Sequence, residues 1–171
     1  LDFSLNNISP DLFRAFIMNN VYFPDHLGTT FIRDKRNLAV LRRLAVDGKF
    51  EGNENELVLD YIPWTELLVN TDVMFEGKTQ NIVKLLKEAK DKFVIKIVDG
   101  LQGKDVFIGK FMTHSDWENA INEALKSGRY IAQEFSDSLD LLAPNRENEW
   151  TPHKLVWGSF GFGDTYGGSW V

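Results

Sequence analysis

A single lysine lies within an apolar, β-branched stretch near the middle of the chain. Lys96 stands inside the run 93–98 (FVIKIV), and Gly100, Gly103 and a further cation, Lys104, follow closely. A lysine in such a strand either extends its ammonium to solvent or is held there for an anionic ligand. Glycines let backbone N–H groups approach a phosphate, so the pattern favours phosphate binding. The alternative is a lysine on a solvated sheet face.

The residues on both sides of these glycines predict a β-hairpin. Residues 93–98 have the β-branched and aromatic character of a largely buried strand, and residues 106–108 (VFI) resume that character after the turn. The connection is longer than a two-residue tight turn. The hairpin is therefore expected to carry Lys96 on its first strand and the glycines in the loop at its tip.

Other common chemistries have little support in the sequence. His26, His114 and His153 are isolated and lack the i, i+4 spacing of a zinc-binding helix. The chain has no cysteine, which excludes disulfides, thiolate metal sites and thiol nucleophiles. A GxGxxG dinucleotide fingerprint is also missing.

Composition limits the class of protein further. The 171 residues are 43% hydrophobic and 26% charged, as is ordinary for one globular domain. The net charge of −6 argues against a general nucleic-acid or anionic-membrane binder, while a local basic pocket remains compatible with it. No run approaches the roughly 20 apolar residues of a membrane-spanning helix, and no signal peptide opens the chain. We expect a cytoplasmic protein without nucleic-acid or membrane partners.

Several helices are expected before and after the hairpin. Ser9 and Pro10 predict a helix start, and a second helix is expected over about residues 31–46. Residues 47–56 read as a surface loop, and residues 77–91 as a helix that leads to the lysine strand. Before these, residues 21–23 suggest a short strand.

The second half of the chain is expected to add one helix and several strands. Ser115 with Glu118 forms a capping-box pattern, and Gly128 is placed to end that helix. A strand over residues 129–135 follows, then a polar connection over 139–150. From His153 onward, aromatic residues and glycines alternate, which predicts two strands joined around Gly163-Asp164 and packed by aromatics. Base stacking on nucleic acid is the alternative, and the acidic balance disfavours it.

At this point the sequence resembles a known family, the circularly permuted ATP-grasp proteins related to glutathionylspermidine synthase-type ligases. The lysine strand and glycine loop look like the family's phosphate-binding hairpin, and residues 130–135 (YIAQEF) look like its adenine-binding hinge strand. Residues 60–65 (DYIPWT) resemble its Pro-Trp-Thr segment. Residues 34–39 (DKRNLA) look like its second ATP-contacting lysine, at the start of a helix. The four motifs occur in the family's order over about residues 20–171.

The resemblance implies an ATP site. The implied nucleotide contacts are Lys35, Lys96, Gly100, Gln102, Gly103, Lys104, Gln133, Glu134 and Phe135. An apolar slot for adenine is expected from Ile95, Ile108, Ile131 and Phe135, with backbone groups near Glu134 and Phe135 reading the adenine edge. Mg²⁺ is implied as well, but the family's metal ligands lie upstream of the Lys35 position, and nothing in residues 1–20 matches them. No metal ligand and no catalytic residue is assigned here.

We therefore expect an α+β protein with an ATP-grasp-like antiparallel sheet and packed helices. Residues 1–171 form one such region, with a helical segment over about 1–50 and a hairpin, helix and hinge-strand subdomain over 57–171, as part of a longer chain. The implied function is the ATP-binding portion of a carboxylate–amine ligase that acts through an acyl phosphate, with unassigned carboxylate and amine substrates. The alternative is a non-catalytic ATP-grasp remnant with a structural or partner-binding role.

Overall fold

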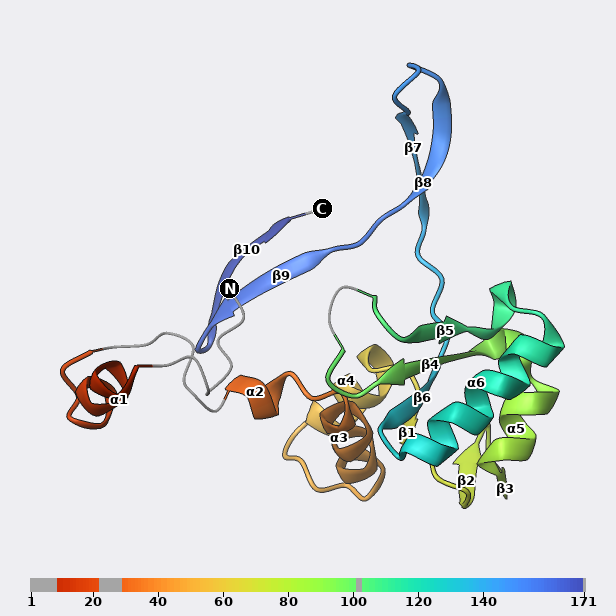
Figure 1. Ribbon diagram of the computed structural model, residues 1–171, viewed down its shortest axis with the longest axis horizontal. Helices are drawn as coiled ribbons and strands as arrows, with labels where there is room; N and C mark the ends of the chain where they lie inside the picture. The colour runs from red at the N-terminus through yellow and green to blue at the C-terminus, as the bar shows by residue number, and fades with distance from the viewer. Residues whose placement is uncertain (1–8, 22–28, 101–102, 171) are drawn as a thin grey trace. The chain divides into compact units, whose positions relative to one another are not determined.

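The computed structural model describes residues 9–21, 29–100 and 103–170 (Figure 1). The chain divides into two compact units, Leu1–Phe135 and Ser136–Val171. The first unit contains helices and an antiparallel sheet, which confirms the α+β class. The second consists of strands alone. Both candidate lysine positions and the hinge strand lie in the first unit.

A four-stranded sheet forms the centre of the first unit. Its strands are β1 (Thr65–Leu67), β4 (Phe93–Ile97), β5 (Val106–Ile108) and β6 (Tyr130–Glu134). Their spatial order is β1-β6-β4-β5, and every neighbouring pair is antiparallel. The predicted hairpin and the strand predicted over residues 129–135 are thus confirmed, and they pair directly with each other.

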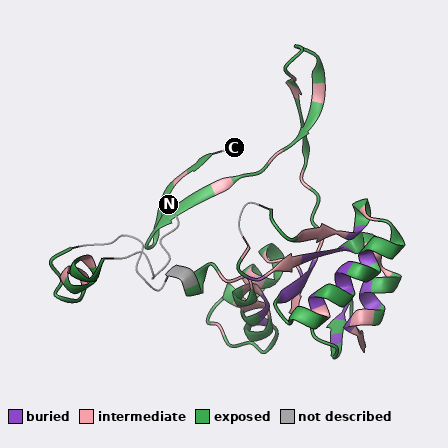
Figure 2. Ribbon diagram, viewed as in Figure 1, coloured by how far each residue is buried: buried purple, intermediate pink, exposed green. Residues whose placement is uncertain are grey.

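One face of this sheet carries the hydrophobic core. Helices α5 (Ile82–Glu88) and α6 (His114–Ser127) contact each other, and α6 contacts both β4 and β6. The buried residues concentrate in these strands and helices (Figure 2). Successive side chains of a strand point to opposite faces, so alternate residues of β4 and β6 enter this core. The strand residues that do so are Phe93, Ile95, Tyr130 and Ala132.

Aromatic side chains fill one end of the core. Trp64 is 8% exposed, donates its indole N–H to the carbonyl oxygen of Met74 at 2.9 Å, and so satisfies its polar atom. Its ring lies 5.3 Å from Phe75 and 5.5 Å from Phe93, both edge-on. Trp64 is therefore a core residue.

The helix predicted over residues 31–46 is two helices. They are α2 (Thr29–Ile32) and α3 (Arg36–Val46), and Lys35 occupies the N-cap position of α3. Helix α1 (Pro10–Ile17) begins as predicted, because the Ser9 side chain accepts from the backbone N–H of Leu12. The strand expected over residues 21–23 falls largely outside the described residues.

Two predictions between residues 47 and 91 are wrong in part. The polar stretch read as a loop contains the start of α4 (Glu54–Tyr61), which packs on α3. The helix expected from Gly77 begins at Ile82, because β3 (Lys78–Asn81) pairs with β2 (Asp72–Phe75). Glu76 and Gly77 join these strands with φ values of 48° and 75°, as a tight hairpin turn requires.

Helix α6 starts earlier than predicted. Thr113 is its N-cap and accepts from the backbone N–H of Asp116 at 3.1 Å, whereas the expected cap Ser115 lies inside the helix. The carboxylate of Asp116 accepts from the Thr113 hydroxyl in return. Gly128 ends the helix with φ of 65°, as expected.

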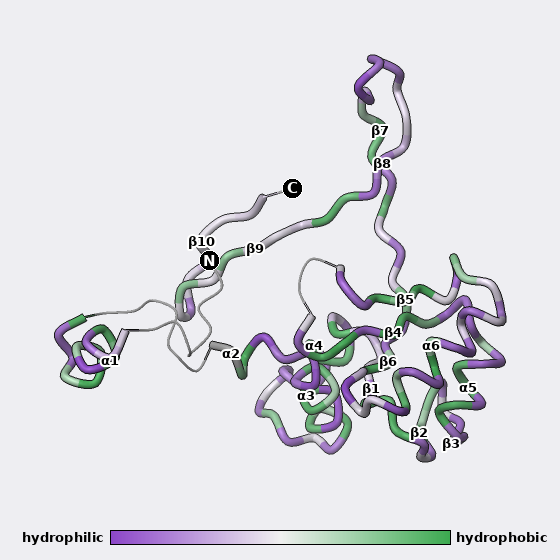
Figure 3. Tube along the Cα trace, viewed as in Figure 1, coloured by the Kyte–Doolittle hydropathy of each residue, from purple (hydrophilic) through white to green (hydrophobic). Residues whose placement is uncertain are grey.

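The second unit is two hairpins with apolar side chains in solvent (Figures 2 and 3). One pairs β7 (Asp140–Pro144) with β8 (Trp150–Lys154), where a polar connection was expected. The other pairs β9 (Gly158–Phe162) with β10 (Thr165–Trp170) around Gly163-Asp164, which confirms that prediction. The expected aromatic packing is found only within the second hairpin, where the rings of Trp170 and Phe162 lie against Gly158 and Gly167. Among the described residues of this unit the most exposed aromatic side chains are Trp150, Trp157, Phe162 and Tyr166.

A close backbone contact at Gly109 gives a test of the first unit. A Cβ atom there would collide with the carbonyl oxygen of Lys90, whose largely buried ammonium also bonds the Gly109 and Met112 carbonyl oxygens. We expect Gly109→Ala to lower the free energy of unfolding by about 3 kcal/mol, since backbone atoms cannot move aside cheaply. Urea unfolding followed by tryptophan fluorescence measures the change.

The matched control is Gly77→Ala in the same unit. Gly77 has open space around it, and its φ of 75° alone disfavours a side chain. The expected loss is therefore smaller, about 1 kcal/mol. Equal losses in the two variants would contradict the close contact at Gly109.

Candidate functional site

The second face of the sheet carries Lys96. This lysine pairs across the strands with Ile131, and its neighbour Val94 pairs with Gln133. The Lys96 ammonium donates to the side-chain oxygen of Gln133 at 2.7 Å. The predicted strand lysine is thus half-buried and bonded to the predicted hinge glutamine, from an adjacent strand.

The hydrogen bond between Lys96 and Gln133 is part of a longer series. The side-chain nitrogen of Gln133 donates to the hydroxyl oxygen of Thr65 at 2.8 Å, and that hydroxyl donates to the carbonyl oxygen of Pro63 at 2.8 Å. Thr65 is 1% exposed and Gln133 is 6% exposed. The contact role of Thr65 was missed from the sequence, because nothing local to residue 65 indicates a partner 68 positions away.

Lys35 reaches the same region from the start of α3. Its backbone N–H donates to the carbonyl oxygen of Val98 at 2.9 Å, just after β4. Its ammonium donates to the carbonyl oxygen of Gly100 at 2.6 Å. Two bonds thus join the start of α3 to the chain that leaves the lysine strand.

The two lysines are close enough for their charges to interact. The pKa of Lys96 lies below its ordinary value, first because burial penalises the ammonium and second because of the positive charge of Lys35. No carboxylate among the described residues lies within ion-pair distance of either ammonium. The nearby Asp34 is paired with Arg36, and Asp99 with Arg129. Two cations without a counter-charge are what an anion site requires.

This arrangement predicts a pH dependence of stability. The folded-state pKa of Lys96 is below 10.5, so the unfolded chain binds more protons between the two values. The cost of the charged lysine is fully present below the folded pKa, and stability rises as pH increases toward 10.5. Urea unfolding at several pH values should show this rise in the parent and a flatter curve in Lys96→Met. Parallel curves would contradict the lowered pKa, since Tyr130 and the other titrating groups are common to both proteins.

The loop beyond β4 is described in part. Gly100 supplies the carbonyl that holds Lys35, and a Cβ atom on it would lie 3.1 Å from the carbonyl oxygen of Lys104. Gly103 adopts φ of 74° in the turn before β5. Gln102 lies outside the described residues. Lys104 is exposed, so the structure shows it at the loop surface with no part in the bonds between Lys35, Lys96 and Gln133.

The hinge residues use their backbone N–H groups within the fold. Glu134 donates to the carbonyl oxygen of Trp64, and Phe135 to that of Lys92, both at 2.8 Å. Neither N–H is therefore available to an adenine edge without breaking a bond. The Phe135 ring lies edge-on to Phe111 at 6.1 Å.

The expected apolar slot is corrected by the strand geometry. Ile95 is fully buried in the core beneath α6, on the face opposite to Lys96. Ile131 and Ile108 do share the lysine face, since Ile131 pairs with Lys96 and Ile108 with Val94. Ile131 is 0% exposed, as is Ile95, so of these three isoleucines only the partly exposed Ile108 could meet an adenine ring on this face.

Arg42 holds α3 in position, a role that was not predicted from the sequence. Its guanidinium donates to the carbonyl oxygens of Leu59 and Ile62, where α4 leads into β1. Burial lowers the pKa of Arg42, and the charges of Glu134 and Glu66 oppose that shift. These two bonds connect α3, whose N-cap is Lys35, to the segment that leads into β1, which begins at Thr65.

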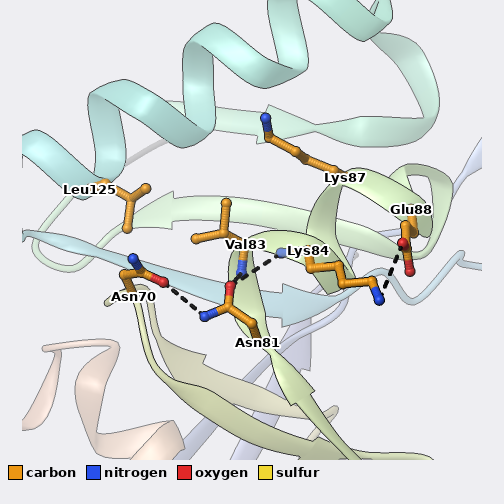
Figure 4. Close-up of a pocket in the computed structure, with 7 residues that line it drawn as sticks. All are labelled: Asn70, Asn81, Val83, Lys84, Lys87, Glu88 and Leu125. Carbon is orange, nitrogen blue, oxygen red and sulfur yellow. Dashed lines mark hydrogen bonds and ion pairs between the residues drawn. The ribbon is translucent and has the colours of Figure 1, made fainter.

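Several surface pockets lie in the first unit, and two of them matter here. One, of about 450 Å³, is lined by residues around Lys35, including Ile32, Leu38 and Leu41. The other, of about 460 Å³, is lined by residues of α5, by Asn70 and Asn81, and by Leu125 near the end of α6 (Figure 4). Its polar groups serve the local fold, since Asn81 caps α5 and Lys84 pairs with Glu88. Lys35 lines the first of these pockets, and Lys96 is not among its lining residues.

No group of three or more His, Cys, Asp or Glu side chains in the described part of the chain could hold a metal ion. No helix there is long and apolar enough to cross a bilayer.

Comparisons of the chain with protein families, with curated proteins and with solved structures found no match.

Proposed function

We propose that this chain is the ATP-binding portion of an ATP-dependent carboxylate–amine ligase with an ATP-grasp-like fold. The observation that supports this most is the meeting of Lys96 and Lys35 beside a glycine-containing loop. They come from a sheet strand and a helix start, and Lys35 bonds a residue 65 positions away. Both ammonium groups have only neutral acceptors among the described residues. Such a pair suits the phosphates of a nucleotide.

The free donors of these lysines fit a phosphate group. An ammonium has three N–H bonds, and Gln133 is the one acceptor of Lys96 among the residues that the structure describes. Two N–H bonds of Lys96 are thus left for phosphate oxygens. Lys35 can exchange the Gly100 carbonyl for a charged oxygen, which gives a stronger bond.

The proposed chemistry needs no covalent protein nucleophile. ATP transfers its γ-phosphoryl group to a carboxylate, and an amine then displaces phosphate from the acyl phosphate. Lys96 and Lys35 would stabilise negative charge on the phosphates during transfer. Mg²⁺ has no ligand set in the described part of the chain, so these residues are assigned binding and charge stabilisation alone.

Calorimetric titration with ATP, ADP and adenosine tests the proposal. We expect weak binding of ATP, weaker binding of ADP, and little binding of adenosine, because the affinity comes from the phosphates. The 171 residues alone should not turn over ATP with any amine acceptor. Equal affinities for ATP and adenosine would overturn the phosphate site, and steady phosphate release by this chain would overturn its assignment as a binding portion.

The second candidate is a non-catalytic ATP-grasp remnant that binds a partner. The observation that favours it is the exposure of Trp150 (71%), Tyr166 (70%) and Trp157 (66%) in the second unit. Exposed aromatic residues of this kind are typical of docking surfaces. Under this alternative Lys96→Met leaves ATP affinity unchanged, whereas the ligase proposal requires a loss.

A further inference from the structure

A directed series of hydrogen bonds ends at Lys96. The Thr65 hydroxyl donates its only proton to the Pro63 carbonyl oxygen, so its oxygen can only accept from Gln133. The Thr65 hydroxyl oxygen therefore accepts from the NH₂ group of the Gln133 amide. The amide oxygen is then left for Lys96, which can only donate. Both ends of the series require the same amide orientation.

We propose that Thr65 is a positioning residue, which fixes the Gln133 amide so that its oxygen holds the Lys96 ammonium in place for phosphate. The proposal rests on the function proposed above. Thr65 itself touches no ligand, and its effect passes through Gln133.

The need for such a residue follows from the symmetry of an amide. The oxygen and the NH₂ group of the Gln133 side-chain amide have nearly the same shape, but the first accepts hydrogen bonds and the second donates them. In the reverse orientation, the NH₂ group would face the ammonium of Lys96 and repel it. Thr65 makes that orientation costly, because a buried NH₂ group would lose its acceptor.

The sheet register puts the three side chains in a row. Thr65 on β1 lies directly across from Gln133 on β6, and Gln133 lies across from Val94 on β4, two residues before Lys96. Thr65, Gln133 and Lys96 share the face opposite the core helices with Val94. Paired residues lie on the same face, and residues two apart on a strand point the same way. The row therefore depends on β6 lying between β1 and β4.

Thr65→Val tests the inference, since it keeps the shape and removes the hydroxyl. In the nucleotide-free protein, we expect NMR titration of the Lys96 side chain to show a further fall in its pKa, because the ammonium loses its acceptor. ATP affinity should fall roughly tenfold. Thr65→Ser, which keeps the hydroxyl, should restore both values. Thr79→Val, the same change at an exposed strand position, should alter neither.

A double-mutant cycle separates positioning from a general structural effect. In a Gln133→Met background Thr65→Val should have no further effect on ATP affinity, because the residue through which it acts is gone. An equal effect in both backgrounds would overturn the inference, as would an unchanged Lys96 pKa in Thr65→Val. If Thr65→Val does not fold, Thr65→Cys, which offers only a weak acceptor, takes its place with the same two outcomes.

The two readouts distinguish the two proposals. If the parent protein does not bind ATP, the proposed function fails, while the Lys96 pKa in Thr65→Val still tests the inference. If ATP binds the parent and the Lys96 pKa is the same in Thr65→Val as in the parent, the inference fails and the proposed function stands.

Discussion

Lys96→Met is expected to weaken ATP binding roughly ten- to a hundredfold, the loss of one charge-assisted bond to phosphate. Methionine keeps the apolar stem of the lysine on the sheet, so stability should change little. It also removes the ammonium whose pKa is lowered by burial and by Lys35. Calorimetric titration of parent and variant with ATP measures the effect.

Adenosine and a second lysine provide the controls for this prediction. Adenosine has no phosphates and should bind parent and variant alike. Lys78→Met makes the same charge change at an exposed position on β3 and should leave ATP affinity within about twofold of the parent, since exposed charges at a distance are screened. Equal ATP affinity in Lys96→Met and parent would end the assignment of Lys96 to phosphate.

Gln133→Glu should have an effect at least as large. A carboxylate at this position would form an ion pair with Lys96, 2.7 Å away in the parent, and raise the pKa of that ammonium. It would also repel the phosphates, and like charges in a binding site cost several kcal/mol, so we expect a loss of about a hundredfold or more in ATP affinity. Titration with ATP and NMR of Lys96 measure the two effects.

The matched control for Gln133→Glu is Gln80→Glu on β3. It changes the net charge equally, away from both lysines, and should leave ATP affinity within about twofold of the parent. A Gln133→Glu protein that binds ATP like the parent would show that Lys96 and Gln133 do not face the phosphates.

The lysine hairpin was predictable because its signals are local. β-branched residues on both sides of Gly100 and Gly103 predict paired strands, and the structure has β4 and β5 there. The error of placing Ile95 in the adenine slot could also have been avoided. Side chains alternate along a strand, so Ile95 and Lys96 point to opposite faces.

The elements that were missed depend on tertiary contacts. Residues 54–56 are polar and follow two glycines, yet they begin α4, a helix that packs on α3. The β2–β3 hairpin was hidden because residues 78–81 (KTQN) have weak strand propensity. Its tight turn at Glu76-Gly77 holds these residues in a strand.

The bonds of the candidate site were only half accessible to sequence reasoning. Lys96 and Gln133 were chosen separately, by pattern and by resemblance, and their contact appears only when β4 pairs with β6. Thr65 belongs to the segment that resembles the family's Pro-Trp-Thr motif, but that resemblance did not indicate its bond to Gln133. The strand order β1-β6-β4 decides which polar residues meet, and short strands carry little information about order.

That strand order also bears on when the site can exist during synthesis. The bond from Gln133 to Thr65 closes a loop of 68 residues, and the bond to Lys96 one of 37. Chains emerge from the ribosome N-terminus first, so both lysines and Thr65 are made well before the strand that joins them. Contacts between distant residues form only after the cost of closing the loop is met. A nascent chain that stops before Tyr130 should therefore be unable to hold a nucleotide, and ribosome-stalled chains of increasing length should gain ATP binding only once β6 has emerged.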